Sequence, residues 1–143
     1  MSLQGRQIVA LTYPGYQELE FWYPVLRGRE EGATVRIVGP ESGAAESFLG
    51  YPVVADTDVA ALDPAEVDVV VVPGVTGAEP AASGAQLDLL RRAHAAGALV
   101  AATGTGAALA AGTLPDDDRV LTAPDADGLS GLFGRLRGAL STD

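Results

Sequence analysis

Short apolar runs rich in β-branched residues alternate along the chain with segments whose apolar residues recur at helical spacing. Runs of the first kind predict buried strands at 7–12, 34–38, 67–72, 98–102 and 119–122. Segments of the second kind predict helices between Gly15 and Gly32, at 86–95, at 105–112 and at 129–140. Strands that alternate with helices require βαβ crossovers. The pattern therefore predicts an α/β fold with a mostly parallel sheet between two layers of helices.

The strand at 67–72 and the segment 41–54 refine this picture. The nearly continuous valines of 67–72 are typical of a strand that is covered on both faces. Residues 41–50 are small and polar, which predicts a loop, and 51–54 is expected to form a short hairpin arm.

The first helical segment carries an apolar stripe at positions i, i+3, i+4 and i+7, formed by Leu19, Trp22, Tyr23 and Leu26. The aromatic residues of this stripe are expected to contact the core or a second copy of the chain. Glu20 lies about 100° from Leu19 around the helix, so periodicity alone places it on a solvated flank. Pro24 has no N–H to donate and is expected to kink the helix or to open a new segment.

The composition narrows the chemistry that is open to the chain. No cysteine is present, which excludes thiolate catalysis, disulfides and cysteine metal sites. All 9 basic residues are arginine, so a lysine Schiff base is excluded as well. The net charge of −10 argues against a nucleic-acid partner, because phosphates require a basic surface. A single histidine among scattered carboxylates offers no metal-ligand spacing.

Length and hydropathy predict where the chain works. Its 143 residues suit a single domain over the whole chain. No apolar run reaches the roughly 18 residues of a membrane span, and no signal-peptide pattern opens the sequence. We therefore expect a soluble cytoplasmic protein with no membrane partner. The exclusive use of arginine, with abundant alanine and glycine, suggests a GC-rich genome, and with it a role in specialised metabolism.

Three predicted strands end in glycine-containing turns, which are Tyr13-Pro14-Gly15, Pro73-Gly74-Val75 and Thr103-Gly104-Thr105. Ligands of open α/β sheets collect beyond the carboxyl ends of the strands, and glycine permits close approach of the backbone there. Residues 99–112 also predict a strand, a sharp turn and a helix, which is the arrangement of a nucleophile elbow. We therefore expect the functional site at these strand ends.

Other polar residues are expected to lie elsewhere. His94 belongs to the helix before the elbow strand and is predicted to face away from the strand ends. The acidic run 116–118 is expected to be a solvated loop.

Several ordered motifs give the chain a resemblance to the ThiJ/PfpI family, within the class I glutamine amidotransferase-like superfamily. They are YPGYQELEFWYP (13–24), REEG (29–32), VDVVVVPG (67–74) and GALVAATGTGAALAAGTL (97–114). The resemblance covers about residues 6–114 and resumes at 119–140, and the chain looks shortened between about 114 and 119. It implies a flavodoxin-like three-layer sandwich that forms a homodimer.

The resemblance also assigns roles to individual positions. The family's elbow cysteine falls on Gly104, which identifies the chain as a divergent member without a nucleophile there. The family's pocket acid falls on Glu20, whose pKa would then be raised by burial, as suits a general acid or base. The second glycine of the family's PGG turn is Val75, which puts its oxyanion pocket in doubt. Proteolysis, deglycation and thiol-dependent glyoxalase chemistry are thereby excluded.

Two residues of the elbow have two interpretations each. Gly104 either relieves strain at an elbow that is no longer used, or clears room for a substrate over the helix N-terminus. Thr105 either donates a hydrogen bond to a ligand or caps the helix.

Two hypotheses about function follow. In the first, the chain is a cofactor-free, metal-free enzyme that acts on a small carbonyl metabolite as an isomerase, hydratase, dehydratase or cyclase. Glu20 would shuttle the proton, and the substrate would lie against Gly15, Tyr16, Gly74, Val75, Thr103, Gly104 and Thr105, with backbone N–H groups of 74, 75 and 105 polarising its oxygen. In the second, the chain is an inactive pseudoenzyme that binds a small molecule or a protein. A weaker third possibility is a partner subunit that completes the pocket.

Overall fold

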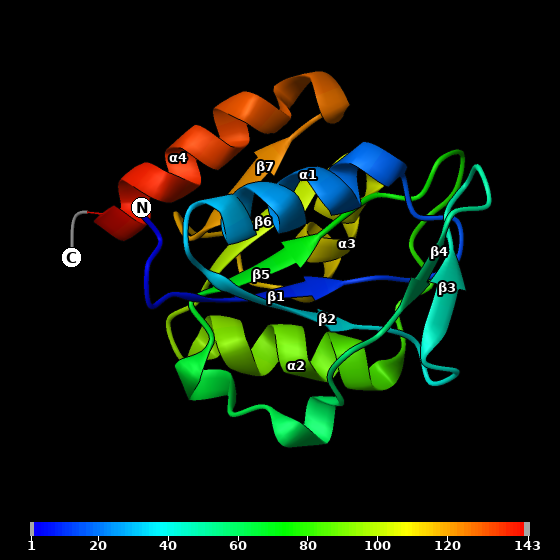
Figure 1. The fold of residues 1–143 in the computed structure, drawn as a ribbon, viewed down its shortest axis with the longest axis horizontal. Helices are drawn as coiled ribbons and strands as arrows, with labels where there is room; N and C mark the ends of the chain where they lie inside the picture. The colour runs from blue at the N-terminus through cyan, green and yellow to red at the C-terminus, as the bar shows by residue number, and fades with distance from the viewer. Residues whose placement is uncertain (1, 142–143) are drawn as a thin grey trace.

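The computed structural model describes residues 2–141, which form a five-stranded sheet and the helices that cover it (Figure 1). The strands lie in the order β2-β1-β5-β6-β7, and every neighbouring pair is parallel. Their bounds are Gln7–Leu11 for β1, Thr34–Val38 for β2, Val69–Val72 for β5, Leu99–Thr103 for β6 and Val120–Ala123 for β7. The predicted strands are thus confirmed, and their carboxyl ends meet at one edge of the sheet.

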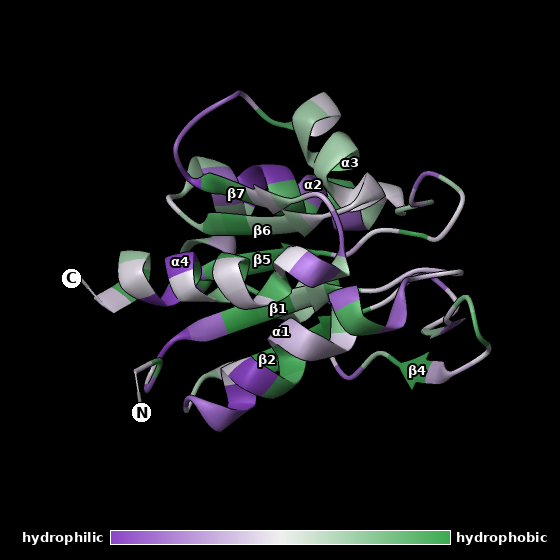
Figure 2. Cartoon of the chain, turned by 90° about the horizontal axis from the view of Figure 1, so that it is seen from above, coloured by the Kyte–Doolittle hydropathy of each residue, from purple (hydrophilic) through white to green (hydrophobic). Residues whose placement is uncertain are grey.

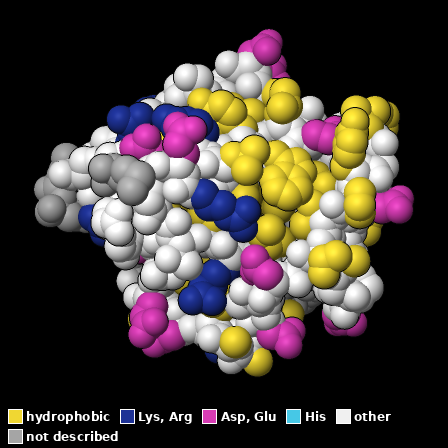
Figure 3. Space-filling model, in the orientation of Figure 1, with side chains coloured by type: hydrophobic (Ala, Val, Ile, Leu, Met, Phe, Trp, Pro, Cys, Tyr) yellow, Lys and Arg dark blue, Asp and Glu magenta, His cyan; other side chains and the backbone are white. Residues whose placement is uncertain are grey.

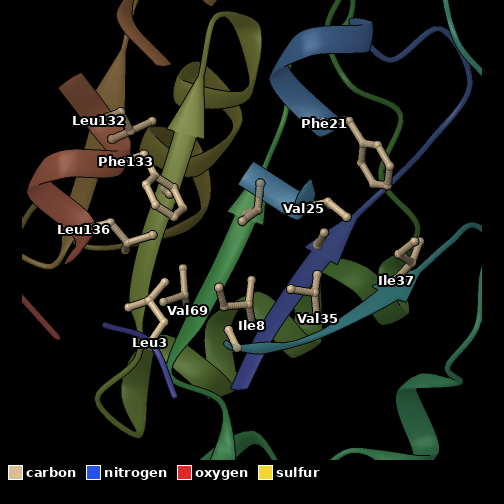
Figure 4. Packing of buried hydrophobic residues seen from close by; sticks show 14 of the residues in the cluster. Leu3, Ile8, Phe21, Val25, Val35, Ile37, Val69, Leu132, Phe133 and Leu136 are labelled. Atoms are coloured by element: carbon tan, nitrogen blue, oxygen red, sulfur yellow. The ribbon is translucent and has the colours of Figure 1, made fainter. Parts of the chain in front are cut away.

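Helices cover both faces of this sheet. Helices α1 (Glu18–Glu30) and α4 (Leu129–Ser141) pack on one face, and α2 (Gly84–Ala95) and α3 (Thr105–Thr113) on the other. Alternate residues of each strand serve the two cores, so that Ile8 and Val69 face Phe21 and Leu136 of α1 and α4 (Figure 4). The most hydrophobic strands lie between the helical layers (Figure 2). The predicted flavodoxin-like three-layer sandwich is confirmed.

Short elements occupy the connections. Residues 41–54 form a two-stranded antiparallel hairpin of β3 (Ala44–Glu46) and β4 (Pro52–Val54), so the prediction of a loop across 41–50 was partly wrong. Single 3₁₀ turns lie at Val59–Ala61 (η1), Pro64–Glu66 (η2) and Ala126–Gly128 (η3). Residues 114–119 connect α3 directly to β7. Within residues 2–141, no helix has the length and apolar character needed to span a membrane.

Helix α1 buries only part of its predicted apolar stripe, since Trp22 and Tyr23 pack against the core as expected. Leu19 is 56% exposed and Leu26 55% exposed, whereas Phe21, Val25 and Gly28 are buried. A Cβ at Gly28 would lie 3.0 Å from Cδ1 of Ile8, so glycine lets the helix approach β1 closely. The helix also continues through Pro24 without opening a new segment.

The histidine and one aspartate of the acidic run meet at the end of the sheet where β7 begins. His94 is buried, and its Nε2 lies 2.8 Å from Oδ2 of Asp117. The Arg119 guanidinium donates to the same Asp117 oxygen at 3.0 Å and to the carbonyl of His94. His94 therefore faces away from the carboxyl ends of the strands, as expected. Asp117 is half-buried and bonded, which corrects the prediction of a purely solvated run.

Candidate functional site

The elbow between β6 and α3 is built around two glycines. Gly104 has φ 58° and ψ −130°, a left-handed conformation that disfavours residues with a Cβ. Gly106, in the first turn of α3, lies so close to the end of β5 that a Cβ would overlap the carbonyl groups of Val72 and Pro73. These glycines bring the N-terminus of α3 directly against the turn that follows β5. The predicted strand, sharp turn and helix are confirmed.

Glu20 reaches this elbow from the first turn of α1. Gln17 caps the helix, because its side chain accepts a hydrogen bond from Glu20 N–H at 2.8 Å. The N–H of Gln17 donates to Gly74 O at 2.9 Å, which ties the start of α1 to the turn after β5. The Glu20 side chain is 6% exposed, and its Oε1 accepts a hydrogen bond from Gly74 N–H at 2.9 Å. The periodicity prediction of a solvated Glu20 was therefore wrong, and the position implied by the family resemblance is observed.

The Glu20 carboxylate lies where the side chain of an elbow residue would begin. A Cβ on Gly104 would stand 2.8 Å from Oε1 and 3.2 Å from Oε2 of Glu20. A Cβ on Gly74 would stand 2.6 Å from Oε1 and 2.9 Å from both Thr103 O and Thr105 N. The Glu20 carboxylate therefore fills the space that a side chain at position 104 would occupy. Both glycines allow the carboxylate to rest directly on the backbone of the elbow.

The environment of Glu20 raises the pKa of its carboxyl group. Burial raises its pKa, the hydrogen bond from Gly74 N–H lowers it, and the negative charge of Asp125 raises it further. Asp125 lies between β7 and η3, where its side chain accepts from Asp127 N–H at 3.0 Å. Sequence reasoning missed Asp125, because the element that carries it is distant along the chain. Glu20 and Asp125 together make the site electronegative.

A buried tyrosine supports the turn after β5. The Tyr13 hydroxyl donates to Pro73 O at 2.6 Å. Burial raises the pKa of Tyr13, and the charge of Glu20 raises it further. Tyr13 therefore stays a neutral hydrogen-bond donor that fixes the turn preceding Gly74.

Thr105 links α3 to the same turn. Val75 N–H donates to Thr105 Oγ1 at 2.8 Å, and the Thr105 hydroxyl lies 3.2 Å from Val75 O, which accepts from it. Gly104 is the N-cap of α3, so the threonine hydroxyl neither caps the helix nor points freely at a ligand. Because Gly74 N–H is bound to Glu20, both N–H groups of this turn have acceptors inside the protein. The first N–H groups of α3, at Thr105 and Gly106, have no acceptor within the helix.

Gly15 and Tyr16 connect the site to the β3–β4 hairpin. Gly15 has φ 81°, and its N–H donates to Glu46 O at 2.8 Å. Tyr16 is fully buried, pairs with Val75 in a single antiparallel bridge and donates its hydroxyl to Tyr51 O at 2.9 Å. Both residues therefore form the wall between the elbow and the hairpin.

Thr103 lies on the other side of the sheet end. It is 1% exposed and lines a cavity of about 10 Å³ under α1 and α4. Its backbone carbonyl is the part of Thr103 that lies beside Gly74 at the elbow. Within residues 2–141, no group of three or more His, Cys, Asp or Glu side chains is placed to hold a metal ion.

This geometry agrees with comparisons to known proteins. The model of the DJ-1/PfpI family matches residues 6–126. The chain belongs to the DJ-1/PfpI family. A protein of Thermococcus kodakarensis that is named a deglycase is 34% identical over 68 residues, which are 48% of this chain and 41% of that protein. The match thus spans less than half of that relative's length.

Solved structures of the DJ-1/PfpI family share the fold. Drosophila melanogaster DJ-1beta superposes with a TM-score of 0.82 at 20% identity, over 96% of this chain and 91% of that one. A ThiJ/PfpI domain protein from Brachyspira murdochii gives 0.77 at 15% identity, over 98% and 99% of the two chains. The fold is therefore retained while most residues differ. The elbow of this member has glycine in place of a side chain.

Proposed function

We propose that this DJ-1/PfpI member is a cofactor-free enzyme that moves a proton on a small carbonyl metabolite, with Glu20 as acid and base. The observation that carries the proposal is the placement of Glu20. Its carboxyl group is 6% exposed, one oxygen is fixed by Gly74 N–H, and Oε2 has no hydrogen bond among residues 2–141. A buried carboxyl group with a raised pKa and one free oxygen is suited to general acid–base catalysis near neutral pH. This retained acid, and the relative that is named a deglycase, favour an enzyme over an inactive pseudoenzyme.

The proposed reaction begins with loss of a proton from the carbon next to the carbonyl. Glu20 accepts this proton, and the oxygen of the resulting enolate is held by the N–H group of Thr105 at the start of α3, which has no acceptor within the helix. Glu20 then returns the proton to another atom of the substrate. Isomerisation, dehydration and cyclisation all share this first step. No bond to the protein forms at the elbow, since Gly104 has no side chain.

Exchange of carbon-bound hydrogen in D₂O tests the proposal without knowledge of the product. A panel of small ketones and aldehydes is incubated with the protein, and loss of the proton signal next to the carbonyl is followed by NMR. We expect exchange with the wild type and a loss of at least about 100-fold in Glu20→Gln. Glu41→Gln, at an exposed glutamate after β2 that lies outside the elbow, is the matched control. Equal exchange by wild type and Glu20→Gln would contradict the proposal.

We further propose that the working form is a homodimer, through a surface that we name the α1–hairpin surface. It comprises the exposed residues Leu19 and Leu26 of α1, the half-buried Trp22 and Tyr23, and Phe48, Leu49 and Tyr51 of the hairpin, each more than half exposed. Hydrophobic side chains gather over α1 and the hairpin on this face of the molecule (Figure 3). The hairpin is joined to α1 by Leu49 N–H, which donates to Glu18 at 2.7 Å.

A second copy is the occupant that this surface suits. Apolar areas of this kind are uncommon on monomers, and a two-fold axis allows one apolar area to cover itself. Arg29 and Glu30 at the end of α1 are exposed and carry opposite charges, so this end of the helix does not repel a second copy. Sedimentation analysis should show a dimer that dissociates in Leu26→Glu and persists in Glu41→Gln, a control outside the surface. A wild-type monomer would contradict this proposal.

A further inference from the structure

Most hydrogen-bond donors of the elbow are already bonded inside the protein. Gly74 N–H donates to Glu20 Oε1 at 2.9 Å, and Val75 N–H donates to Thr105 Oγ1 at 2.8 Å. The Thr105 hydroxyl donates in turn to Val75 O at 3.2 Å. The turn after β5 therefore offers neither of its N–H groups to a ligand, and the start of α3 provides the donors that remain.

The groups left to meet a ligand are mainly acceptors. Glu20 Oε2 has no hydrogen bond among residues 2–141, and it lies 3.2 Å from the place where a Cβ of residue 104 would stand. The charged neighbour that acts on Glu20 is a second carboxylate, Asp125. The chain as a whole carries a net charge of −10, which repels anions at longer range.

We propose that this site selects carbonyl compounds that carry a hydroxyl or ammonium group on the carbon next to the carbonyl, and that it rejects 2-oxo acids. The ligand's hydroxyl or ammonium group donates to Glu20 Oε2, while its carbonyl oxygen accepts from the N–H groups at the start of α3. A carboxylate in the same place meets Glu20 and Asp125, two groups of its own charge. The inference rests on the proposed function, because it gives the substrate class for the same carboxylate.

Thr105 is the specificity-determining residue in this arrangement. Its hydroxyl takes up the Val75 N–H that would otherwise be a second donor for a carbonyl or carboxylate oxygen. Thr105→Val keeps the branched shape of the side chain and removes the hydroxyl. The Val75 N–H then loses its acceptor inside the protein, and we expect the turn to become a better donor for acceptor-rich compounds.

Three ketones of matched size test the selectivity. Aminoacetone, hydroxyacetone and pyruvate share a methyl ketone and differ in carrying an ammonium group, a hydroxyl group or a carboxylate. Their dissociation constants are measured by ¹H–¹⁵N NMR titration of the full chain, with the signals of Gly74 and Gly104 as reporters. We expect pyruvate to bind at least about 10-fold more weakly than both of the others. The ratio between aminoacetone and hydroxyacetone shows whether charge or hydrogen bonding dominates.

Thr105→Val should lower the dissociation constant of pyruvate several-fold and so reduce its difference from the other two ketones. If the variant does not fold, the order of the three dissociation constants in the wild type tests the inference by itself. Pyruvate binding as tight as hydroxyacetone, or no perturbation by any of the three, would overturn the inference. The outcome is separate from that of the proposed function. Glu20-dependent exchange of pyruvate would support proton transfer by Glu20 and contradict the proposed rejection of 2-oxo acids. Selective binding without exchange would support the selectivity and contradict proton transfer.

Discussion

Replacing Gly104 with alanine tests how closely Glu20 and the elbow are packed together. The new Cβ would stand 2.8 Å from Oε1 and 3.2 Å from Oε2 of Glu20, inside normal contact distance. The carboxyl group must therefore withdraw, and withdrawal breaks its 2.9 Å hydrogen bond from Gly74 N–H. The residue must also hold φ near 58°, where a side chain is strained.

The free-energy cost of this substitution has two parts of comparable size. Backbone strain at a positive φ costs about 1–3 kcal/mol. Loss of a hydrogen bond to a charged group costs about 1.5–3 kcal/mol. The first part is independent of Glu20, whereas the second disappears once Glu20 is truncated to alanine. A double-mutant cycle separates them, because residues in contact show coupling and distant residues do not.

The assay is urea denaturation of four proteins: wild type, Gly104→Ala, Glu20→Ala and the double variant. We expect Gly104→Ala to destabilise the wild type by about 1.5–3 kcal/mol more than it destabilises Glu20→Ala, a difference worth roughly 5–10 °C in Tm. If the two costs agreed within about 0.5 kcal/mol, the carboxylate would not rest on the elbow backbone, and the close packing of Glu20 on Gly104 would be refuted.

Two further predictions concern stability. Burial raises the pKa of Glu20, so the pKa in the folded state exceeds the value of about 4.3 in the unfolded state. The contribution of Glu20 to stability is therefore complete below about pH 4.3 and is lost as the pH rises through the folded-state pKa. Thermal melts should therefore show Glu20→Gln more stable than wild type at pH 8, with the gain absent near pH 4; a gain that is the same at both pH values would contradict this. Gln86 is fully buried, and its Nε2 donates to Thr12 O at 2.8 Å and to Val38 O at 2.9 Å. Gln86→Met removes both hydrogen bonds and leaves Thr12 O unpaired, whereas Val38 O keeps the hydrogen bond from Thr12 N–H at 3.1 Å. Chemical denaturation should show a loss of about 1–3 kcal/mol, and a loss below about 0.5 kcal/mol would refute the role of this side chain.

The elements of the fold follow from local patterns, whereas the orientation of α1 does not. Valine-rich runs predicted the central strands because both of their faces are buried. Helix α1 carries apolar residues on two faces, and only contact with β1 selects Phe21, Val25 and Gly28 for the core over Leu19 and Leu26. The stripe therefore predicted the core contacts of Trp22 and Tyr23 and not the exposure of Leu19 and Leu26.

The site was predictable from the sequence where it depends on motif positions, and unpredictable where it depends on distant contacts. The elbow at Gly104 and the acid at Glu20 follow from their places in the family motifs. The bond between Thr105 and Val75 joins residues 30 positions apart, and the influence of Asp125 on Glu20 comes from the other end of the chain. No local pattern encodes either contact.

The role of Glu20 as the base in proton transfer can be measured through the pH dependence of exchange. The initial rate of deuterium incorporation into hydroxyacetone is followed from pH 4 to pH 9 with wild type and with Glu20→Gln. Because the base must be ionised, we expect one rising limb whose midpoint lies above the ordinary glutamate pKa of about 4.3, and no such limb in the variant. A midpoint at or below the ordinary value, or an unchanged profile in Glu20→Gln, would show that another group transfers the proton.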